Sequence, residues 1–404
     1  MRQVERHLVK SSHKHFKVLD ELAFLSKNLY NASLYILRQE YFKSNKILSF
    51  NTVYHIVKSS IDYTALPAKV SQLVIKQVAD NFINWEKALK AYTKYPHKFL
   101  GKPRIPKYKD KLKGRNKLTY NNQAFSKSAL KCGLIKLSKT NITFKTKQDS
   151  VDEVRLIPKP NGTYYLEVVY SVEEKQLVEN NNYAAIDIGL NNLATLGTND
   201  PNIKPIIVNG KAIKSCNRWF NKRKAYLQSR LPKDTFTSKR LDRLSIKRTS
   251  KLDYYLHKSS KQIVDYLTNN EITKLVIGKN DNWKQNINIG KKNNQNFTSV
   301  PHAKFIEILT YKAQKEGIEV VLTEESYTSK TSFLDKELPV KQTKYLGKRI
   351  KRGLFKSSSG IKINADLNGS LQILTKVVGK FTDLISENSI LRLVVSPVRF
   401  TLLS

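Results

Sequence analysis

The spacing of apolar residues divides this chain into a helical part, a strand-rich part and a part in which strands and helices alternate. From about residue 13 to residue 92, apolar residues recur every three or four positions, which is the period of one face of an α-helix. Two stripes have this spacing, and we interpret both as core positions of a helical bundle. Their members are Leu22, Leu25, Leu29, Ala32 and Ile36, and Val74, Val78, Phe82, Trp85 and Leu89.

A basic segment with three prolines follows these helices. Residues 94–117 contain Pro96, Pro103 and Pro106, which interrupt a helix, and they alternate Lys and Arg with aromatic residues. Cations can hold phosphates while neighbouring rings stack on bases, so we expect nucleic-acid contacts here. A solvated linker is the alternative interpretation. The candidate contacts are Lys102, Arg104, Lys107, Tyr108 and Lys109.

Strand-forming segments dominate from about residue 112 to residue 178. The segments NITFKTK, EVRLIPK and TYYLEVVYSV are rich in β-branched and aromatic residues. Between the last two, Pro160, Asn161 and Gly162 form a turn sequence typical of a hairpin. This part of the chain therefore predicts a small sheet or β-barrel.

The remaining part, from residue 179 onward, alternates strands with helices. AAIDIGLNNLATLGT contains two strand-like segments joined by a turn with glycine, and TKLVIG and IEVVLTEE are later strands with a helix near 303–316 between them. A final helix begins after INADLNG. This order predicts an α/β domain.

Positive charge indicates the kind of partner that the chain binds. Lys and Arg number 72 against 33 Asp and Glu, a formal net charge of +39 that favours a polyanion. No apolar run is long enough to span a membrane, and the charged start of the chain is unlike a signal peptide. Nucleic acid is therefore favoured over a membrane surface. Only Cys132 and Cys216 are present, which excludes a disulfide framework and favours the cytoplasm.

The excess of positive charge is strongest between residues 211 and 260. This stretch has 15 Lys or Arg and 3 Asp or Glu, and its apolar spacing is helical. We expect a pair of basic helices, more one-sided in charge than solubility requires. The candidate phosphate contacts are Lys222, Arg223, Lys224, Arg230, Arg240, Arg243, Lys247 and Arg248.

Four acidic residues lie at the ends of apolar strands or at a helix start. Burying a carboxylate is costly unless cations or hydrogen bonds compensate, so these positions are candidate metal ligands. Asp187 ends the strand AAID, and Asp366 lies where the final helix begins, although a turn or helix cap is the plainer role for each. Glu324 and Glu325 end IEVVLTEE, and strand alternation sends them to opposite faces.

Three such carboxylates from different strands and helices could bind two Mg²⁺ ions. Carboxylate and water ligands suit Mg²⁺, and a pair of these ions can activate water and stabilise the leaving oxygen in phosphodiester hydrolysis. This arrangement needs neither Cys nor His. The chemistry predicted from these residues is therefore metal-dependent cleavage of nucleic acid.

A family resemblance extends over most of the chain. LYNASLYILRQEYF, PRIPKYK, AAIDIGLNNLAT, RLSIKRTSKLDYYLHKSSKQIVDYL, YTSKTS and INADLNGS occur in an order that resembles TnpB, the OrfB protein of small insertion sequences. Fanzor proteins and type V CRISPR effectors are similar. The resemblance implies a multidomain protein in which a wedge β-barrel with an inserted helical recognition lobe precedes an α/β RNase H-like RuvC nuclease domain. The implied bounds are 1–12 for the first wedge strand, 13–111 for the lobe, 112–178 for the barrel and 179–404 for RuvC.

The same resemblance implies an RNA-guided DNA endonuclease encoded by a transposable element. A guide RNA from the transposon end pairs with target double-stranded DNA, while the protein reads a short adjacent motif and cuts both strands at one RuvC site. Asp187 and Asp366 match the first and last catalytic Asp, with Mg²⁺ as cofactor and Mn²⁺ as a substitute. A separate transposase is a further expected companion, and cytoplasmic protein would join the nucleoid when bound to DNA.

One departure from the family concerns the second catalytic residue. The family has a Glu at the end of a strand resembling V-I-E-D-L, but this chain has Gly278, which cannot bind metal. We predict that Glu325 replaces it, as a relocated Glu does in Fanzor-like and some TnpB-like sequences. Glu324 is the fallback, and Asp281 is a weaker third choice.

A second departure concerns the zinc ribbon that most relatives carry. Ser332 and Asp335 stand where the first cysteine pair would be, and no Cys follows Cys216. We therefore expect no zinc, with the insertion at 328–362 held by its own packing or by nucleic acid.

Two other functions stay open. A nuclease-inactive RNA-guided repressor is consistent with the missing Glu at position 278, and a protein-only DDE-type transposase would share the RNase H-like fold. Magnesium-dependent cutting and a requirement for RNA separate these possibilities from a guided nuclease.

Overall fold

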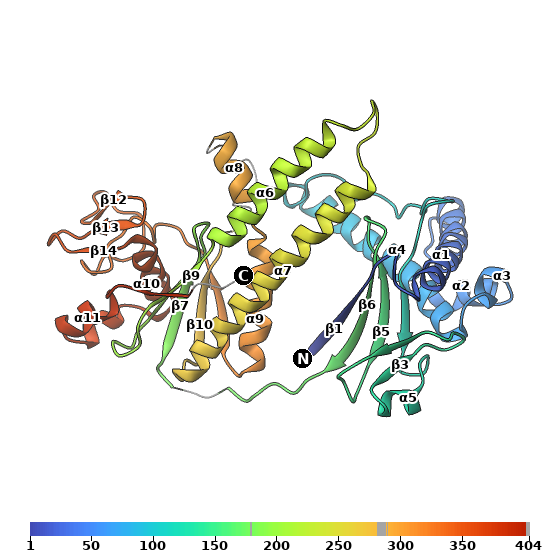
Figure 1. Ribbon diagram of the computed structural model, residues 1–404, viewed down its shortest axis with the longest axis horizontal. Helices are drawn as coiled ribbons and strands as arrows, with labels where there is room; N and C mark the ends of the chain where they lie inside the picture. Colours follow the sequence, from blue (N-terminus) through green and yellow to red (C-terminus); the bar gives the residue numbers. More distant parts are fainter. Residues whose placement is uncertain (178–179, 281–287, 289, 401–404) are drawn as a thin grey trace. The chain divides into compact units, whose positions relative to one another are not determined.

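The computed structural model describes residues 1–177, 180–280, 288 and 290–400, and it divides after Val172 into two units (Figure 1). We call Met1–Val172 the N-terminal unit and Glu173–Ser404 the C-terminal unit. Each unit has its own main sheet and its own hydrophobic core, which confirms the predicted multidomain organisation. In the part of the chain that the structure describes, no helix has the length and apolar character needed to cross a membrane.

In the sequence of the N-terminal unit, the helices α1 to α4 come between β1 and the remaining strands of the main sheet, and the short helix α5 follows β2. The strands of this unit are β1 (Arg2–Val9), β2 (Leu118–Asn121), β3 (Leu134–Lys136), β4 (Thr143–Lys145), β5 (Glu153–Pro158) and β6 (Tyr164–Ser171). Its helices are α1 (Phe16–Ser44), α2 (Phe50–Val57), α3 (Ile61–Thr64), α4 (Ala68–Lys94), the 3₁₀ turn η1 (Pro96–Lys98) and α5 (Lys127–Lys131).

The main sheet of this unit is open, so the prediction of a closed barrel was wrong for the described strands. The antiparallel order is β1-β6-β5-β2, which leaves β1 and β2 as edges, and β3 pairs only with β4. One core joins Leu34 of α1 and Val74 of α4 to Leu156 and Leu166 of the sheet. Because helices already bury the apolar face of the sheet, the sheet does not need to close on itself.

The basic connector after α4 is bound along α1 rather than being a solvated linker. Lys27 donates to the carbonyl of Lys111 at 2.7 Å, and Arg38 donates to the carbonyl of Pro106 at 2.8 Å. The Asn31 amide both donates to and accepts from the backbone of Lys109, at 2.9 Å each. These side chains satisfy backbone groups that no sheet or helix pairs, which orders a segment rich in prolines.

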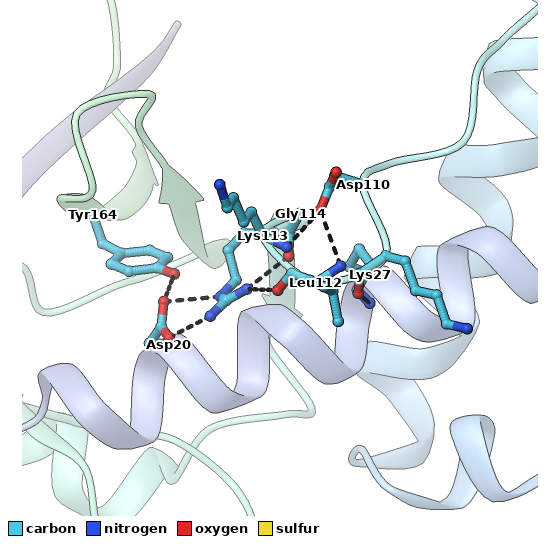
Figure 2. Close-up of polar contacts among 9 residues, drawn as sticks. Asp20, Lys27, Asp110, Leu112, Lys113, Gly114 and Tyr164 are labelled. Atoms are coloured by element: carbon cyan, nitrogen blue, oxygen red, sulfur yellow. Dashed lines mark hydrogen bonds and ion pairs between the residues drawn. The ribbon is translucent and has the colours of Figure 1, made fainter. Parts of the chain in front are cut away.

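A polar cluster ties the end of this connector to α1 and to the sheet (Figure 2). Arg115 donates to both oxygens of Asp20, at 2.9 and 2.7 Å, and the Tyr164 hydroxyl donates to Asp20 at 2.5 Å. Figure 2 shows Asp20 on the helix below Tyr164, with the turn from Asp110 to Gly114 alongside. The hydrogen bonds from Arg115 lower the pKa of Asp20, while burial and the adjacent Asp20 raise the pKa of Tyr164.

We predict that Asp20→Asn lowers the unfolding free energy of the protein by about 1–3 kcal/mol at pH 7, because hydrogen bonds to a charged group are lost. Because the pKa of Asp20 is lower in the folded state, its contribution is present above the unfolded pKa and disappears as pH falls through the folded value. Urea unfolding at pH 7 and at acidic pH measures both effects. Asp80→Asn, which breaks only the exposed Lys76 pair, is the matched control and should change stability by less than about 0.5 kcal/mol.

The C-terminal unit is built on a six-stranded mixed sheet. The strands of the unit are β7 (Tyr183–Asp187), β8 (Asn192–Thr198), β9 (Ile206–Asn209), β10 (Lys274–Gly278), β11 (Glu319–Thr323), β12 (Lys348–Lys351), β13 (Leu354–Lys356), β14 (Lys362–Asn364) and β15 (Val398–Phe400). Of these, β12, β13 and β14 form a separate three-stranded sheet. The helices of the unit are α6 (Lys211–Gln228), α7 (Lys239–Asn269), α8 (Lys291–Thr298), α9 (His302–Lys315), α10 (Ala365–Val378), η2 (Phe381–Leu384) and α11 (Glu387–Leu393).

The order of the six strands is β11-β10-β7-β8-β9-β15. The first three are parallel neighbours, whereas β8 is antiparallel to β7 and to β9. Successive residues of the central strands face different cores: Ala184 and Ile186 pack with α7 and α9, while Ala185 and Val276 pack with α10. Helices thus cover both faces of the sheet (Figure 1), which is why these strands are continuously apolar in sequence.

The final helix begins inside the INADLNG motif rather than after it. Asn364 is the N-cap, and its side chain accepts from the backbone N–H groups of Asp366 and Leu367 at 2.9 and 3.1 Å. The carboxylate of Asp366 is therefore not the cap that the plainer interpretation assigned to it, and it can interact elsewhere.

Hydrogen bonds accepted by carboxylates fasten the insertion at 328–362. The buried Glu337 accepts from the backbone N–H groups of Ser332 at 2.7 Å and Leu346 at 2.9 Å. Asp335 accepts from the backbone and hydroxyl of Ser358. The Asn368 side chain binds the backbone of Phe333 and Thr331, which joins the insertion to α10. Ser332 and Asp335, which stand where the first cysteine pair was expected, both take part in these hydrogen bonds.

Candidate active site

Three parallel strands end at one edge of the C-terminal sheet. Asp187 is the last residue of β7, Gly278 is the last residue of β10, and Glu325 lies two residues beyond the end of β11. Parallel neighbours carry their carboxyl ends to the same edge, which is the usual position of a site in an open α/β sheet. The pairing thus collects residues that are far apart in sequence.

Asp366 reaches this edge from α10, which packs on the β7–β8–β10 part of the sheet. Gly369 makes the approach possible, because a Cβ atom at this position would lie 2.9 Å from Oδ2 of Asp187. The first turn of α10 therefore lies directly against Asp187. Asn192 of β8 donates to Oδ2 of Asp366 at 2.7 Å, and Arg349 of β12 donates to Oδ1 at 3.2 Å.

Glu325 lies over Gly278, the position that lacks the expected Glu. A Cβ atom on Gly278 would lie 2.6 Å from both Cγ and Oε1 of Glu325, which is closer than real Cβ contacts. The Glu325 side chain in this conformation and any side chain at position 278 therefore exclude each other. The absence of a side chain at 278 provides the space that Glu325 occupies.

Glu324, the fallback, points elsewhere. Its exposed carboxylate lies 4.0 Å from Lys376 and accepts from the Ser326 hydroxyl. Glu325, and not Glu324, is thus the glutamate that interacts electrostatically with Asp187. Asp281, the third choice, lies outside the described residues.

The three carboxylates interact electrostatically. Burial raises the pKa of Asp187 well above its ordinary value, and the negative charges of Glu325 and Asp366 add to this shift. Arg349 acts in the opposite direction on Asp187. Burial also raises the pKa of Glu325 to about 7. Desolvation and like charges both disfavour the ionised forms of these carboxyl groups. Their ionisation therefore lowers the stability of the folded protein.

The donor set suits a hard divalent cation. Oε1 of Glu325 is buried and has no hydrogen-bond partner among the residues that the structure describes, and an unpaired buried oxygen of this kind is costly. A cation among Asp187, Glu325 and Asp366 would offset both this cost and the repulsion, and oxygen ligands are those that Mg²⁺ prefers. Across the described ranges, no three His, Cys, Asp or Glu side chains are arranged so that they could hold a metal ion. Asp366 forms an ion pair with Arg349 in this arrangement.

We predict that Glu325→Gln raises the thermal stability of the protein at pH 8 in EDTA and leaves it nearly unchanged at pH 4, below the ordinary pKa of the side chain. The pKa of Glu325 is about 7 in the folded protein against an ordinary value of 4.5, so wild-type stability falls as pH rises between these values. Removing the charge recovers up to about 3 kcal/mol. Differential scanning fluorimetry at both pH values measures the effect. Glu324→Gln is the matched control, and an equal gain in that variant would contradict the assignment.

The predicted nucleic-acid contacts are distributed over both units and are mostly solvent-exposed. In the N-terminal unit Lys109 is the exception, because it lies over the Tyr30 ring at 4.8 Å and burial lowers its pKa. In the C-terminal unit Arg248 is half-buried and donates to Asn217 and to the carbonyl of Ser299, so it is a structural residue. The exposed candidates are Lys102, Arg104, Lys107, Tyr108, Lys222, Arg223, Lys224, Arg230, Arg240, Arg243 and Lys247.

Two exposed aromatic residues on α6 were missed when only basic residues were considered. Trp219 and Tyr226 have exposed fractions of 46% and 42%. Arg223 and Arg230 lie over the Tyr226 ring at 4.9 and 4.3 Å, and Lys247 lies over Trp219 at 5.6 Å. The i, i+7 spacing of the two rings on a basic helix is a signal that the sequence already contained. We call these two rings and three cations the α6 aromatic surface.

Comparisons with known families match two segments. The family model OrfB_IS605, described as "Probable transposase", matches residues 167–284, and the model described as "Cas12f1-like, TNB domain" matches residues 302–373. The first segment contains Asp187 and Gly278, and the second contains Glu325 and Asp366. No curated protein matches the chain in sequence.

Similar solved structures are distant. A Cas12f1–sgRNA–target DNA complex is 14% identical, with alignment over 92% of this chain and 98% of that chain and a TM-score of 0.36. The mini-RNA-guided endonuclease CRISPR-Cas-phi3 is 10% identical, with coverage of 94% and 92% and a TM-score of 0.45. C2c1 of Alicyclobacillus acidoterrestris in complex with single-guide RNA is 9% identical, with coverage of 91% and 68% and a TM-score of 0.38. Likeness at this level is too low to transfer a function.

Proposed function

We propose that this chain, which matches an OrfB-type model over residues 167–284 and a Cas12f1-like TNB model over residues 302–373, is an RNA-guided DNA endonuclease of the TnpB type. The observation that carries the proposal is the electrostatic interaction of Asp187 with Glu325 and Asp366 at one sheet edge, where Oε1 of Glu325 is buried without a hydrogen-bond partner among the described residues. Such a group is expected where divalent cations support phosphodiester cleavage.

Chemically, two Mg²⁺ ions at this site would generate the water nucleophile and stabilise the leaving oxygen, and Mn²⁺ can substitute. Asp187 and Asp366 are fixed by β7 and α10, and Glu325 presents Oε1. Arg349 must release Oδ1 of Asp366 before that oxygen can bind an ion. Its guanidinium is then available to a phosphate of the nucleic acid.

In fold terms, the C-terminal unit fits an RNase H-like (RuvC) domain. The antiparallel strands β7, β8 and β9, followed by β10 and β11 parallel to β7, support this assignment. The N-terminal unit then corresponds to the wedge and recognition lobe, with an open sheet in place of a barrel. The guide RNA would come from the transposon end, and target double-stranded DNA would be recognised beside a short motif.

The exposed basic residues would hold the phosphates of guide and target, and the α6 aromatic surface would contact unpaired bases. Fifteen Lys or Arg against three acidic residues between 211 and 260 support a polyanion as the partner of α6 and α7. Exposed rings beside cations are the usual means of binding single-stranded nucleic acid.

The test of the proposal is to express the chain with its native flanking DNA, sequence the RNA that copurifies, and treat the complex with Mg²⁺ and a plasmid library of randomised flanks. We expect cleavage directed by the RNA. RNA-directed binding without cleavage would favour a nuclease-inactive repressor. Action on the ends of the element with no RNA would favour a protein-only transposase.

We predict that Asp187→Ala and Asp366→Ala each reduce cleavage to below about one-thousandth of wild type, because each removes a metal ligand that acts as part of a unit. RNA and DNA binding should be retained, since neither carboxylate is a phosphate contact. Plasmid cleavage and filter binding measure the two properties. Full cleavage in either variant would disprove the active-site assignment.

We also predict that Lys222→Ala reduces the slope of log K against log salt for single-stranded DNA binding by about 0.7, the release of one counterion. Trp219→Ala should weaken binding by about 1–3 kcal/mol and leave the slope unchanged, because stacking releases no counterions. Fluorescence anisotropy between low and high salt measures both. Lys175→Ala, which removes the partner of Glu316, is the control and should change neither quantity.

A further inference from the structure

Asn280 contacts Glu325 with both ends of its carboxamide. Its Oδ1 accepts from the backbone N–H of Glu325 at 2.9 Å, and its Nδ2 donates to Oε2 of the Glu325 carboxylate at 3.3 Å. Asn280 lies two residues beyond the end of β10, which is the strand that pairs with β11. One side chain therefore fixes the backbone and the carboxylate of the same residue.

The position of Glu325 explains why such a contact is needed. Pairing between β10 and β11 ends at Gly278 and Thr323, and the last backbone hydrogen bond at this end runs from Lys279 to the carbonyl of Thr323 at 2.8 Å. Glu325 lies beyond this point, so no ladder partner holds its N–H. The Asn280 side chain replaces that partner. On the other side, the carbonyl of Glu325 accepts from the Thr328 hydroxyl at 2.8 Å and from its backbone N–H at 3.2 Å.

The contact also determines which carboxylate oxygen is available. With Oε2 bound to Asn280, Oε1 lies over Gly278 and has no hydrogen-bond partner within the described part of the chain. A glutamate side chain has several rotatable bonds, and its rotamer freedom would disperse this oxygen if the carboxylate were not held. The amide of Asn280 accepts through its oxygen and donates through its nitrogen, so it can bind the backbone N–H and the carboxylate of Glu325 at the same time.

We propose that Asn280 is a positioning residue for Glu325: its carboxamide holds the backbone and Oε2, so that Oε1 over Gly278 is presented to the metal. This inference rests on the proposed function, because it assigns Asn280 a role toward the cation of that site. Asn280 itself is not a ligand in this arrangement, since both of its polar atoms are bound to Glu325.

The experiment measures Mn²⁺ binding to the protein–RNA complex by isothermal titration calorimetry, together with cleavage over a range of Mg²⁺ concentrations. Asn280→Ala should weaken Mn²⁺ binding by about 10- to 100-fold, the usual effect of removing a residue that orients a metal ligand. Cleavage should then require correspondingly more Mg²⁺. The melting temperature and RNA affinity are measured alongside. Asn202→Ala, at an exposed position between β8 and β9, is the matched control and should match wild type throughout.

Two further variants test the specificity of the effect. Asn280→Leu keeps a similar volume without the hydrogen bonds, and it should bind Mn²⁺ as weakly as the alanine variant even if Asn280→Ala lowers the stability of the protein. In a Glu325→Ala background, Asn280→Ala should cause no additional loss of Mn²⁺ affinity, because the effect passes through Glu325. Additive losses would mean that Asn280 acts independently of Glu325 and would overturn the inference.

The outcomes for Asn280 and for the proposed function are separable. Wild-type Mn²⁺ affinity in Asn280→Ala and Asn280→Leu overturns the positioning role, even if the wild-type protein cleaves DNA. A wild-type protein that binds Mn²⁺ but never cleaves removes the nuclease proposal, while the comparison of Mn²⁺ affinities still decides whether Asn280 positions Glu325.

Discussion

The parallel pairing of β10 with β7 and β11 is the constraint on which the candidate site depends. It places the ends of three strands at one edge, although Asp187, Gly278 and Glu325 are separated by long stretches of chain. The central strands are buried on both faces by α7, α9 and α10, so a shift of register would move apolar side chains out of two cores at once. The position of the carboxylates is therefore fixed by the most buried part of the unit.

At this edge the protein tolerates an unfavourable concentration of negative charge. The chain as a whole has a formal net charge of +39, yet burial and mutual repulsion raise the pKa of Asp187, and burial raises that of Glu325 to about 7. Arg349 offsets part of this repulsion through its contact with Asp366. Carboxyl groups whose pKa values are raised by desolvation and by like charges are typical of functional sites.

Several contacts of the candidate site and of the insertion depend on the identity of single residues rather than on the overall fold. Gly278 and Gly369 create space for Glu325 and Asp187, and Asn364 takes over the cap of α10 and leaves Asp366 free. In the insertion, Glu337 and Asp335 bind backbone N–H groups that link distant parts of the segment. Of these, only Gly278 and the insertion depart from the pattern that the family resemblance implies: empty space stands where a Glu was expected, and hydrogen bonds stand where cysteines were expected.

The sequence by itself determined the helical and strand-rich regions, the apolar strands that precede Glu325 and end in Asp187, and the basic character of α6 and α7, because periodicity and charge are local properties. Tertiary structure decided what depends on contacts between distant residues. Helices cover the N-terminal sheet, so it stays open, and Arg248 is half-buried and bound to Asn217. Strand alternation allowed either Glu324 or Glu325 to face the site. Glu325 occupies the space above Gly278 and is bound by the amide of Asn280. Gly278 ends β10 and Asn280 follows it, and the local sequence does not show that this strand pairs with β11.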